Sequence, residues 1–277
     1  MAFVVVSDLS KTFISKNQMV IAALANVSLE MERNQFLCIV GPSGGGKSTL
    51  LNIMAGFERP SQGKVLVGGH EVKGPSPSRA MVFQEFALFP WFTVRENVAF
   101  GLEMQSMSKP ERDEVVSHYL DLVGLRRFAN NFPIELSGGM KQRVAIARAL
   151  AVNPEMLLMD EPFGGLDSHT RGFMQQELLR IWEKERKTVA FVTHSIDEAI
   201  TLADTVAVIA GRPGTVRSFT KVSLPRPREE ADPEFVKLKV EVRSQIQAAS
   251  LSEEEWETDA GGVGRESRWR KFRLFAR

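Results

Sequence analysis

The chain has 277 residues, of which 43% are hydrophobic and 25% charged, with a formal net charge of +1 at pH 7. This length admits one large α/β domain or two small ones, and the balanced charge gives no bulk field that would attract nucleic acid. A single cysteine, Cys38, excludes an intrachain disulfide and fits a cytosolic setting. No apolar run approaches the ~18 residues that a bilayer crossing needs, and the N-terminus lacks the features of a signal peptide. If the protein acts at a membrane, we expect a partner to hold it there.

Short apolar segments near the N-terminus predict strands. They span residues 3–6, 27–31 and 36–40. Asn34 tolerates positive φ and is expected in the turn before the third segment. A glycine-rich loop, Gly41-Pro-Ser-Gly-Gly-Gly-Lys47-Ser48, follows that segment, and residues 48–55 predict a helix ending at Gly56. This order of strand, loop and helix is the context that a phosphate-binding loop requires.

Backbone N–H groups of such a loop converge on phosphate oxygens, and glycines leave their approach open. The residues assigned to this cradle are Gly41, Pro42, Ser43, Gly44, Gly45, Gly46, Lys47, Ser48 and Thr49. Lys47 places a positive charge between the β- and γ-phosphates, and the Ser48 hydroxyl can bind Mg²⁺.

The middle of the chain has a different pattern from its flanks. Helical periodicity dominates residues 93–107, 110–123 and 138–151, which predicts a helical insertion. After it, strand-like runs alternate with helical patterns, which predicts a largely parallel sheet. The strand-like runs are residues 156–160, 188–193 and 205–210, and the helical ones are residues 169–185 and 196–203. No internal repeat is present, so a fused pair of such units is excluded.

Polar residues at the ends of the predicted strands carry the chemistry. Asp160 and Glu161 end an apolar run, where one carboxylate can hold Mg²⁺ and the next can orient and deprotonate a water molecule. Gln84 follows the apolar residues 81–83, and His194 follows residues 188–193. Each of these residues alone would be read as an ordinary strand end. Between them lies the segment Leu136-Ser-Gly-Gly-Met140.

In this order the motifs resemble the ATP-binding subunit of an ABC (ATP-binding cassette) transporter, over roughly residues 3–225. The resemblance implies an α/β fold with a P-loop NTPase (RecA-like) core, an N-terminal antiparallel β subdomain and an α-helical insertion. The cassette is expected to cover residues 1–225, with the helical subdomain at about 93–150. Residues 226–277 then form a partly helical C-terminal extension with a charged tail.

The resemblance also implies an ATPase that uses ATP and Mg²⁺, and it assigns residue roles. Catalysis is expected from Glu161, His194, Lys47 and Gln84, and Mg²⁺ coordination from Ser48, Gln84 and Asp160. In the family, the loop of Ser137, Gly138 and Gly139, together with Asp167, acts across a dimer of cassettes. Phe13 is expected to stack on adenine, with core packing as the alternative. The chain departs from common family residues at Phe13, Gly45, Gly165 and Ser195.

Residues 86–98 and 210–214 look like the subgroup of importers for nitrate, sulfonate and taurine. This predicts import of a small anionic solute through a separate membrane permease, with a solute-binding protein as an indirect partner. Phe89, Pro90 and Trp91 are expected either to contact that permease or to form a small core within the insertion. A homodimer, or a pair with a similar cassette, is expected at the cytoplasmic face of the bacterial inner membrane, without nucleic acid.

Other functions remain open at this stage. An exporter ATPase shares the same nucleotide chemistry. A non-transport ABC complex usually has a long coiled-coil insertion or two cassettes in one chain, and this chain has neither. A regulatory cassette with impaired hydrolysis is disfavoured by the presence of Lys47, Asp160, Glu161 and His194.

The region after Leu224 changes composition. Residues 225–230 look like a linker, and residues 234–250 predict one amphipathic helix. An acidic run at residues 253–259 precedes a basic, aromatic end at residues 265–277. That end is expected either to lie on an anionic membrane or permease surface or to be a solvated tail.

Overall fold

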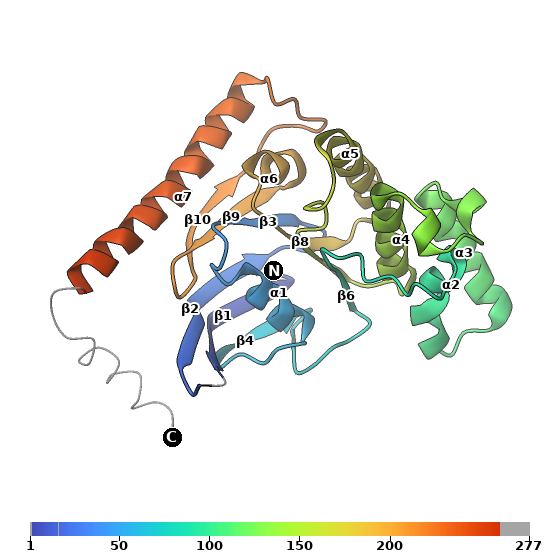
Figure 1. Ribbon diagram of the computed structural model, residues 1–277, viewed down its shortest axis with the longest axis horizontal. Coiled ribbons are helices and arrows are strands. Elements are labelled where there is room, and N and C mark those ends of the chain that lie inside the picture. Colours follow the sequence, from blue (N-terminus) through green and yellow to red (C-terminus); the bar gives the residue numbers. More distant parts are fainter. Residues whose placement is uncertain (1, 16, 261–277) are drawn as a thin grey trace.

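A computed structural model describes residues 2–15 and 17–260, and it contains two β-sheets flanked by helices (Figure 1). The larger sheet has six strands in the order β10-β9-β3-β8-β7-β6, and only β10 is antiparallel to its neighbour. Its strands are β3 (Phe36–Val40), β6 (Arg79–Val82), β7 (Met156–Asp160), β8 (Thr188–Thr193), β9 (Thr205–Ala210) and β10 (Thr215–Lys221). The predicted α/β class with a largely parallel sheet is therefore confirmed.

The smaller sheet is antiparallel, with the order β2-β1-β4-β5. Its strands are β1 (Val4–Ile14), β2 (Val20–Met31), β4 (Gln62–Val67) and β5 (His70–Glu71). β1 and β2 extend well beyond the predicted segments, because polar side chains interrupt their apolar pattern while backbone pairing continues through register shifts. β4 was not predicted, since it begins with polar residues and contains Gly63 at φ 76°.

The central strand β3 separates two hydrophobic cores. Phe36, Cys38 and Val40 belong to one core, and Leu37 and Ile39 belong to the other. All five residues are buried, as expected for a parallel strand covered on both faces. The core on the Leu37 side packs the small sheet against the helix α1 (Lys47–Ala55).

The other core holds most of the remaining helices. They are α2 (Val94–Ala99), α3 (Lys109–Leu122), α4 (Gly138–Ala151), α5 (Ser168–Glu185), α6 (Ile196–Leu202) and α7 (Pro233–Ala260). Figure 1 shows α2, α3 and α4 gathered at one end, away from the small sheet. Three short 3₁₀ turns lie nearby, at Phe100–Met104, Arg126–Phe128 and Pro133–Glu135.

The helical periodicity predicted over residues 93–107 corresponds to α2 followed by a 3₁₀ turn, not to one continuous α-helix. A capping box between Thr93 and Glu96 starts α2 as expected. The helix then tightens to 3₁₀ geometry at Phe100. At the next residue, Gly101, a Cβ atom would lie 2.5 Å from the Val152 side chain, so close packing against the end of α4 accompanies the change.

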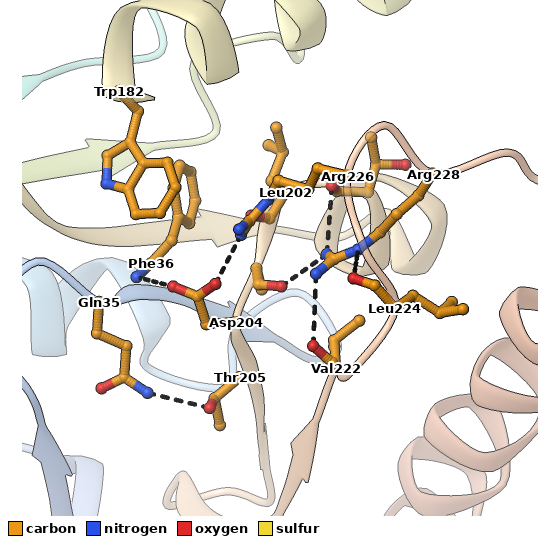
Figure 2. Close-up of polar contacts among 12 residues, drawn as sticks. Gln35, Phe36, Trp182, Leu202, Asp204, Thr205, Val222, Leu224, Arg226 and Arg228 are labelled. Atoms are coloured by element: carbon orange, nitrogen blue, oxygen red, sulfur yellow. Dashed lines mark hydrogen bonds and ion pairs between the residues drawn. The ribbon is translucent and has the colours of Figure 1, made fainter. Parts of the chain in front are cut away.

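Two arginines hold the connection between β10 and α7 against the sheet (Figure 2). Arg226 pairs with Asp204 at 2.9 Å, and Asp204 accepts the Phe36 N–H at 2.8 Å. Arg228 donates to the carbonyl of Ala203 at 2.7 Å, at the end of α6, and to that of Leu224 at 2.9 Å. The segment predicted as a linker is thus fixed, because its guanidinium groups satisfy carbonyls that the end of α6 leaves open.

The last helix is longer than predicted. α7 starts at Pro233 and continues through the acidic run to Ala260, and it packs against α6, β9 and β10 (Figure 1). The basic end at residues 265–277, for which a membrane or solvated role was expected, lies outside the described residues. Within the part of the chain that the structure describes, none of the helices has the length and apolar character to span a bilayer.

Candidate functional site

The glycine loop occupies the predicted position between β3 and α1. Gly44 and Gly46 both have φ 81°, a left-handed conformation that side chains disfavour. A Cβ atom on Gly41 would lie 1.8 Å from the carbonyl oxygen of Ile209, so the loop packs directly on β9. The sequence therefore needs glycine here for two reasons, which are backbone conformation and close approach.

Lys47 is 5% exposed and lies over its own loop. Its ammonium group donates to the carbonyls of Gly41 at 2.9 Å and Pro42 at 2.8 Å. Burial lowers the pKa of Lys47, while the nearby carboxylates of Glu161 and Asp160 oppose that shift. Its positive charge is thus held at the loop with few competing contacts to water.

The hydroxyl of Ser48 and the carboxylate of Asp160 meet at the end of the sheet. Ser48 Oγ donates to Asp160 Oδ1 at 3.0 Å, although the two residues are far apart in the sequence. Burial raises the pKa of Asp160, whereas the Ser48 hydrogen bond and the Lys47 charge lower it. Two oxygen ligands predicted for a hard cation are therefore brought together.

Glu161 and His194 also meet at this edge. Glu161 Oε2 lies 3.1 Å from His194 Nδ1. Glu161 has φ 44°, which is unfavourable for a residue with a side chain, and its N–H donates to the carbonyl of Val192 at 2.9 Å. Such strain is characteristic of functional positions, and here it turns the carboxylate toward the histidine.

Gln84 reaches the same group from β6. A Cβ atom on Gly164 would lie 3.2 Å from Gln84 Nε2 and 3.7 Å from Glu161 Oε2. The amide of Gln84 and the carboxylate of Glu161 therefore both lie within 4 Å of the place where a side chain at residue 164 would begin. Any side chain at residue 164 would enter the space between them.

The Leu136–Met140 segment begins α4, as predicted. Ser137 is the N-cap, and its hydroxyl accepts the Met140 N–H at 3.3 Å. Ser137 is exposed. Leu136 belongs to the core of α4 and α5, whereas the helix that follows the glycine loop belongs to the other core. The glycine loop and the Leu136–Met140 segment thus begin helices in different layers of the chain.

Asp167 caps α5 beside that segment. Its carboxylate accepts the Thr170 N–H at 3.0 Å, and this hydrogen bond lowers the pKa of Asp167. A Cβ atom on Gly138 would lie 3.1 Å from the Leu166 side chain, and one on Gly139 would lie 3.0 Å from that of Thr170. The loops around residues 138 and 167 are therefore packed against each other within one chain.

Phe13 lies near the tip of the β1–β2 hairpin and is 36% exposed. It is not a core residue, which disfavours the packing alternative. Lys11 lies with its ammonium 4.7 Å from the centre of the Phe13 ring and pairs with Glu58 at 2.9 Å. The hairpin therefore offers an aromatic ring at the surface, with a cation beside it.

The aromatic residues after Gln84 form a surface cluster that also includes Phe100. The ring centre of Phe89 lies 4.4 Å from that of Phe100 and 5.8 Å from that of Trp91. Trp91 is 67% exposed, whereas Phe89 is partly buried. Phe89 packs within the insertion, whereas the Trp91 side chain is exposed, so a permease contact of Trp91 stays a prediction.

Two charged residues at the site were not predicted as site residues. The guanidinium of Arg212 lies about Gly44, with Nη2 3.4 Å from where a Cβ atom would stand. Glu198 is 5% exposed and lines the same small pocket as Glu161 and His194. Arg212 lies in the segment 210–214, which the sequence had indicated only for the importer subgroup, and the one available signal for Glu198 was an acidic residue on the apolar face of a predicted helix.

A glycine loop between a parallel strand and a helix, with a carboxylate and a hydroxyl meeting beside it, defines a P-loop nucleotide-binding protein. The family model for ABC transporters matches residues 24–164. The chain belongs to this family, and it is an ATP-hydrolysing cassette.

Characterised relatives resemble the chain over most of its length. It is 44% identical to the nitrate import ATP-binding protein NrtD of Synechocystis sp. over 259 residues, which cover 90% of this chain and 97% of that protein. It is 47% identical to the taurine import ATP-binding protein TauB of Roseobacter denitrificans over 211 residues, covering 76% and 79%. Among solved structures, the dimeric post-hydrolysis state of the ATP-binding cassette MJ0796 bound to ADP and Pi matches with a TM-score of 0.69 and 36% identity. That match covers 80% of this chain and 100% of the cassette, and it confirms the P-loop NTPase fold.

Proposed function

We propose that this chain is the ATPase subunit of an importer, and that Glu161, His194, Lys47 and Gln84 carry out its hydrolysis step. The observation that carries the residue assignment is the contact of Glu161 with His194 at 3.1 Å, beside the contact of Ser48 with Asp160 at 3.0 Å. Both pairs lie at the end of the sheet that holds the glycine loop. This arrangement supports an attack on the terminal phosphate of a nucleotide in that loop.

Lys47 binds the phosphates in this mechanism. Its ammonium now donates to two loop carbonyls, and on binding it exchanges them for β- and γ-phosphate oxygens. The exchange is favoured because charge-assisted hydrogen bonds to phosphate are stronger than those to neutral carbonyls. The N–H groups of the glycine loop hold the rest of the phosphate chain.

Glu161 acts as the general base. It takes a proton from the water molecule that attacks the γ-phosphorus, as the bond to ADP breaks. An ionised carboxylate only accepts hydrogen bonds, so its contact with His194 places a proton on Nδ1 of the ring. This contact orients Glu161, and we place Nε2 of His194 at a γ-phosphate oxygen. Gln84, beside Glu161, is placed to orient the same water.

The residues at the site also fit Mg²⁺. Ser48 and Asp160 offer a hydroxyl and a carboxylate oxygen, with the Gln84 amide oxygen as a third ligand, and Mg²⁺ prefers such hard oxygen donors. Among the described residues no cluster of three or more His, Cys, Asp or Glu side chains forms a full metal cage. That suits an ion held by one carboxylate together with substrate phosphates. When bound, the ion neutralises charge on the β- and γ-phosphates.

The functional unit we propose is a dimer in which Ser137, Gly138 and Gly139 complete the site of the other subunit. Ser137 is exposed at the start of α4, with N–H groups available for an anion. The helix after the glycine loop and α4 stand in different layers of the chain. A second copy, opposed head to tail, would bring its own Ser137 to the phosphates, and the dimeric state of the MJ0796 cassette supports this assembly. We place Phe13 at the adenine ring.

The transported solute is proposed to be a small anion such as nitrate, a sulfonate or taurine, delivered by a solute-binding protein to a separate permease. The names of the relatives NrtD and TauB support import. We place the subunit peripherally on the cytoplasmic face of the inner membrane. The cassette is proposed to cover residues 1–225, with its helical subdomain at about 93–150, and residues 226–277 to form an extension.

Transport in both directions tests this proposal. The subunit is reconstituted with its co-purifying permease in vesicles, and labelled nitrate and taurine are supplied with the binding protein on the opposite side. We expect ATP-dependent movement toward the side of the ATPase subunit, and none with Lys47→Ala. Movement away from that side would identify an exporter, and hydrolysis without movement of any solute would indicate a non-transport complex.

Trp91 is proposed to anchor the permease. Trp91→Ala should weaken association of the subunit with the permease, because buried aromatic anchors at interfaces contribute roughly 2 kcal/mol or more. The exposed Trp91 is the better choice for a single substitution than Phe89, whose ring packs on Phe100. ATP binding by the isolated subunit should not change.

Co-purification of the tagged subunit with the permease measures this effect, with Phe219→Ala as the control. Phe219 is also exposed, at 49%, but lies on β10. Equal recovery of the permease with wild type and Trp91→Ala would show that the aromatic cluster serves only the insertion.

A further inference from the structure

Glu198 is a buried carboxylate that lines one pocket with the proposed catalytic histidine. It lies in α6 and is only 5% exposed, and one pocket is lined by Glu161, Arg171, Thr193, His194 and Glu198. Burial of a carboxylate costs free energy unless the group is hydrogen-bonded, so the hydrogen-bond partners of Glu198 indicate its role. Burial raises the pKa of Glu198, and its hydrogen bonds with Thr193 and Gln175 oppose that shift.

Hydrogen bonds join Glu198 in a closed cycle with Thr193 and Ser195, the two residues that flank His194. Thr193 donates its hydroxyl to Glu198 Oε2 in a short hydrogen bond. The Ser195 N–H donates to Thr193 Oγ1 at 3.0 Å, and the Glu198 N–H donates to Ser195 Oγ at 3.3 Å. Thr193 is thus bonded directly to the Glu198 carboxylate, and Ser195 is connected to it through Thr193 Oγ1, while His194 itself is exposed and contacts Glu161.

The second oxygen of Glu198 connects this cycle to α5. Gln175 donates from Nε2 to Glu198 Oε1 at 3.2 Å. Gln175 lies two turns beyond Asp167, which caps the same helix, and Arg171 lies between them on the same face. Arg171 donates to the Leu166 carbonyl at 3.0 Å and lines the pocket with Glu198. The helix that begins at the Asp167 loop is therefore linked to the backbone on either side of His194.

From this geometry we infer that Glu198 is a positioning residue for hydrolysis, which fixes His194 against Glu161 and against α5. Packing alone does not hold the exposed imidazole of His194 in place. Hydrogen bonds that fix the residues on either side of it do. Glu198 itself does not contact the substrate. The inference rests on the proposed role of His194, and the experiment below separates the two.

The test measures steady-state ATP hydrolysis by the full-length chain. Glu198→Ala should lower kcat by about 10- to 100-fold, since small misplacements of catalytic groups have effects of this size. KM and ATP affinity should stay close to wild type, because the glycine loop is untouched. Glu198→Gln should restore most of the activity, since its amide oxygen can accept the Thr193 hydroxyl once the Gln175 amide turns over.

Two further variants separate positioning from loss of fold. Thr193→Val keeps the shape of the side chain but removes the hydroxyl that joins Glu198 to Ser195, so it should also lower kcat, even if Glu198→Ala does not fold. Asp197→Asn is the matched control in the same helix, where Asp197 pairs with Lys239 of α7 at 2.6 Å. It should hydrolyse ATP at the wild-type rate.

A double-mutant cycle with His194→Ala decides whether Glu198 acts through the histidine. In the His194→Ala background, Glu198→Ala should change kcat by less than about twofold. A second substitution has little further effect when both residues act through the same side chain. If the fold-loss in kcat of the double variant equals the product of the losses of the two single variants, the inference is overturned, while the role of His194 stays intact. Wild-type turnover by Glu198→Ala and Thr193→Val would also overturn it. Near-normal hydrolysis by His194→Ala would instead remove the proposed role of His194, and the inference with it.

Discussion

Glu161→Gln is expected to abolish ATP turnover while ATP binding persists. The substitution keeps the shape of the side chain and its contact with His194, but an amide cannot accept the proton of the attacking water. Loss of a general base typically lowers the rate by ~10²–10⁴-fold. The phosphates contact Lys47 and the glycine loop in the proposed mechanism, so nucleotide affinity should remain within the wild-type range.

Single-turnover hydrolysis and equilibrium binding of ATP, measured on the full-length chain, check this result. Glu155→Gln is the matched control, because Glu155 lies at the opposite end of β7 and pairs with Arg33 on the surface at 3.2 Å. It should hydrolyse ATP normally. Hydrolysis by Glu161→Gln at the rate of the control would reject Glu161 as the base.

A heterodimer of Ser137→Arg with Lys47→Ala should keep one intact ATP site. If Ser137 acts on the ATP of the other subunit, both lesions fall on the same composite site. If Ser137 acted within its own chain, each site would carry one lesion. The Ser137→Arg homodimer should have no working site, because the arginine side chain would block the start of α4. The Lys47→Ala homodimer should have none either, because both of its glycine loops lack the lysine.

The heterodimer is isolated through two different affinity tags on the full-length chains, and the ATP it retains is measured together with its hydrolysis. We expect the heterodimer to retain ATP at one site, and both parent homodimers to retain none. A heterodimer as inactive as its parents would place both lesions in separate sites and contradict the proposed assembly. A heterodimer of two Lys47→Ala subunits with different tags controls for the isolation procedure.

The sequence by itself determined the elements whose patterns are local. β3, β7, β8 and β9 are buried on both faces, so their unbroken apolar runs mark their bounds directly. α4 begins at the predicted residue because Ser137 is an N-cap whose hydroxyl replaces a missing backbone partner. The positive φ of Asn34 followed from the same kind of local chemistry.

Local patterns failed where long-range pairing forms the element. β4 is polar over its first half and is held by β1, which is distant in the sequence. The helical segment predicted at residues 93–107 changes from α-helix to 3₁₀ geometry where Gly101 packs against Val152, which its periodicity did not indicate. In the sequence, the arginines that fix residues 222–228 are typical of a charged linker. In the structure, they lie beside the open carbonyls at the end of α6 and bond to them.

The candidate site also has features that the sequence predicts and features that only the tertiary structure decides. The order of the motifs identified the family and the residue types, because phosphate binding needs glycines, a lysine and a hydroxyl at fixed spacing. Only the tertiary structure decided which of these side chains meet, since parallel strands carry Ser48 to Asp160 and Glu161 to His194 from distant parts of the chain. It also placed Glu198 in one pocket with His194, which the sequence did not indicate, since a buried carboxylate has no sequence pattern of its own and takes its role from the hydrogen bonds that surround it.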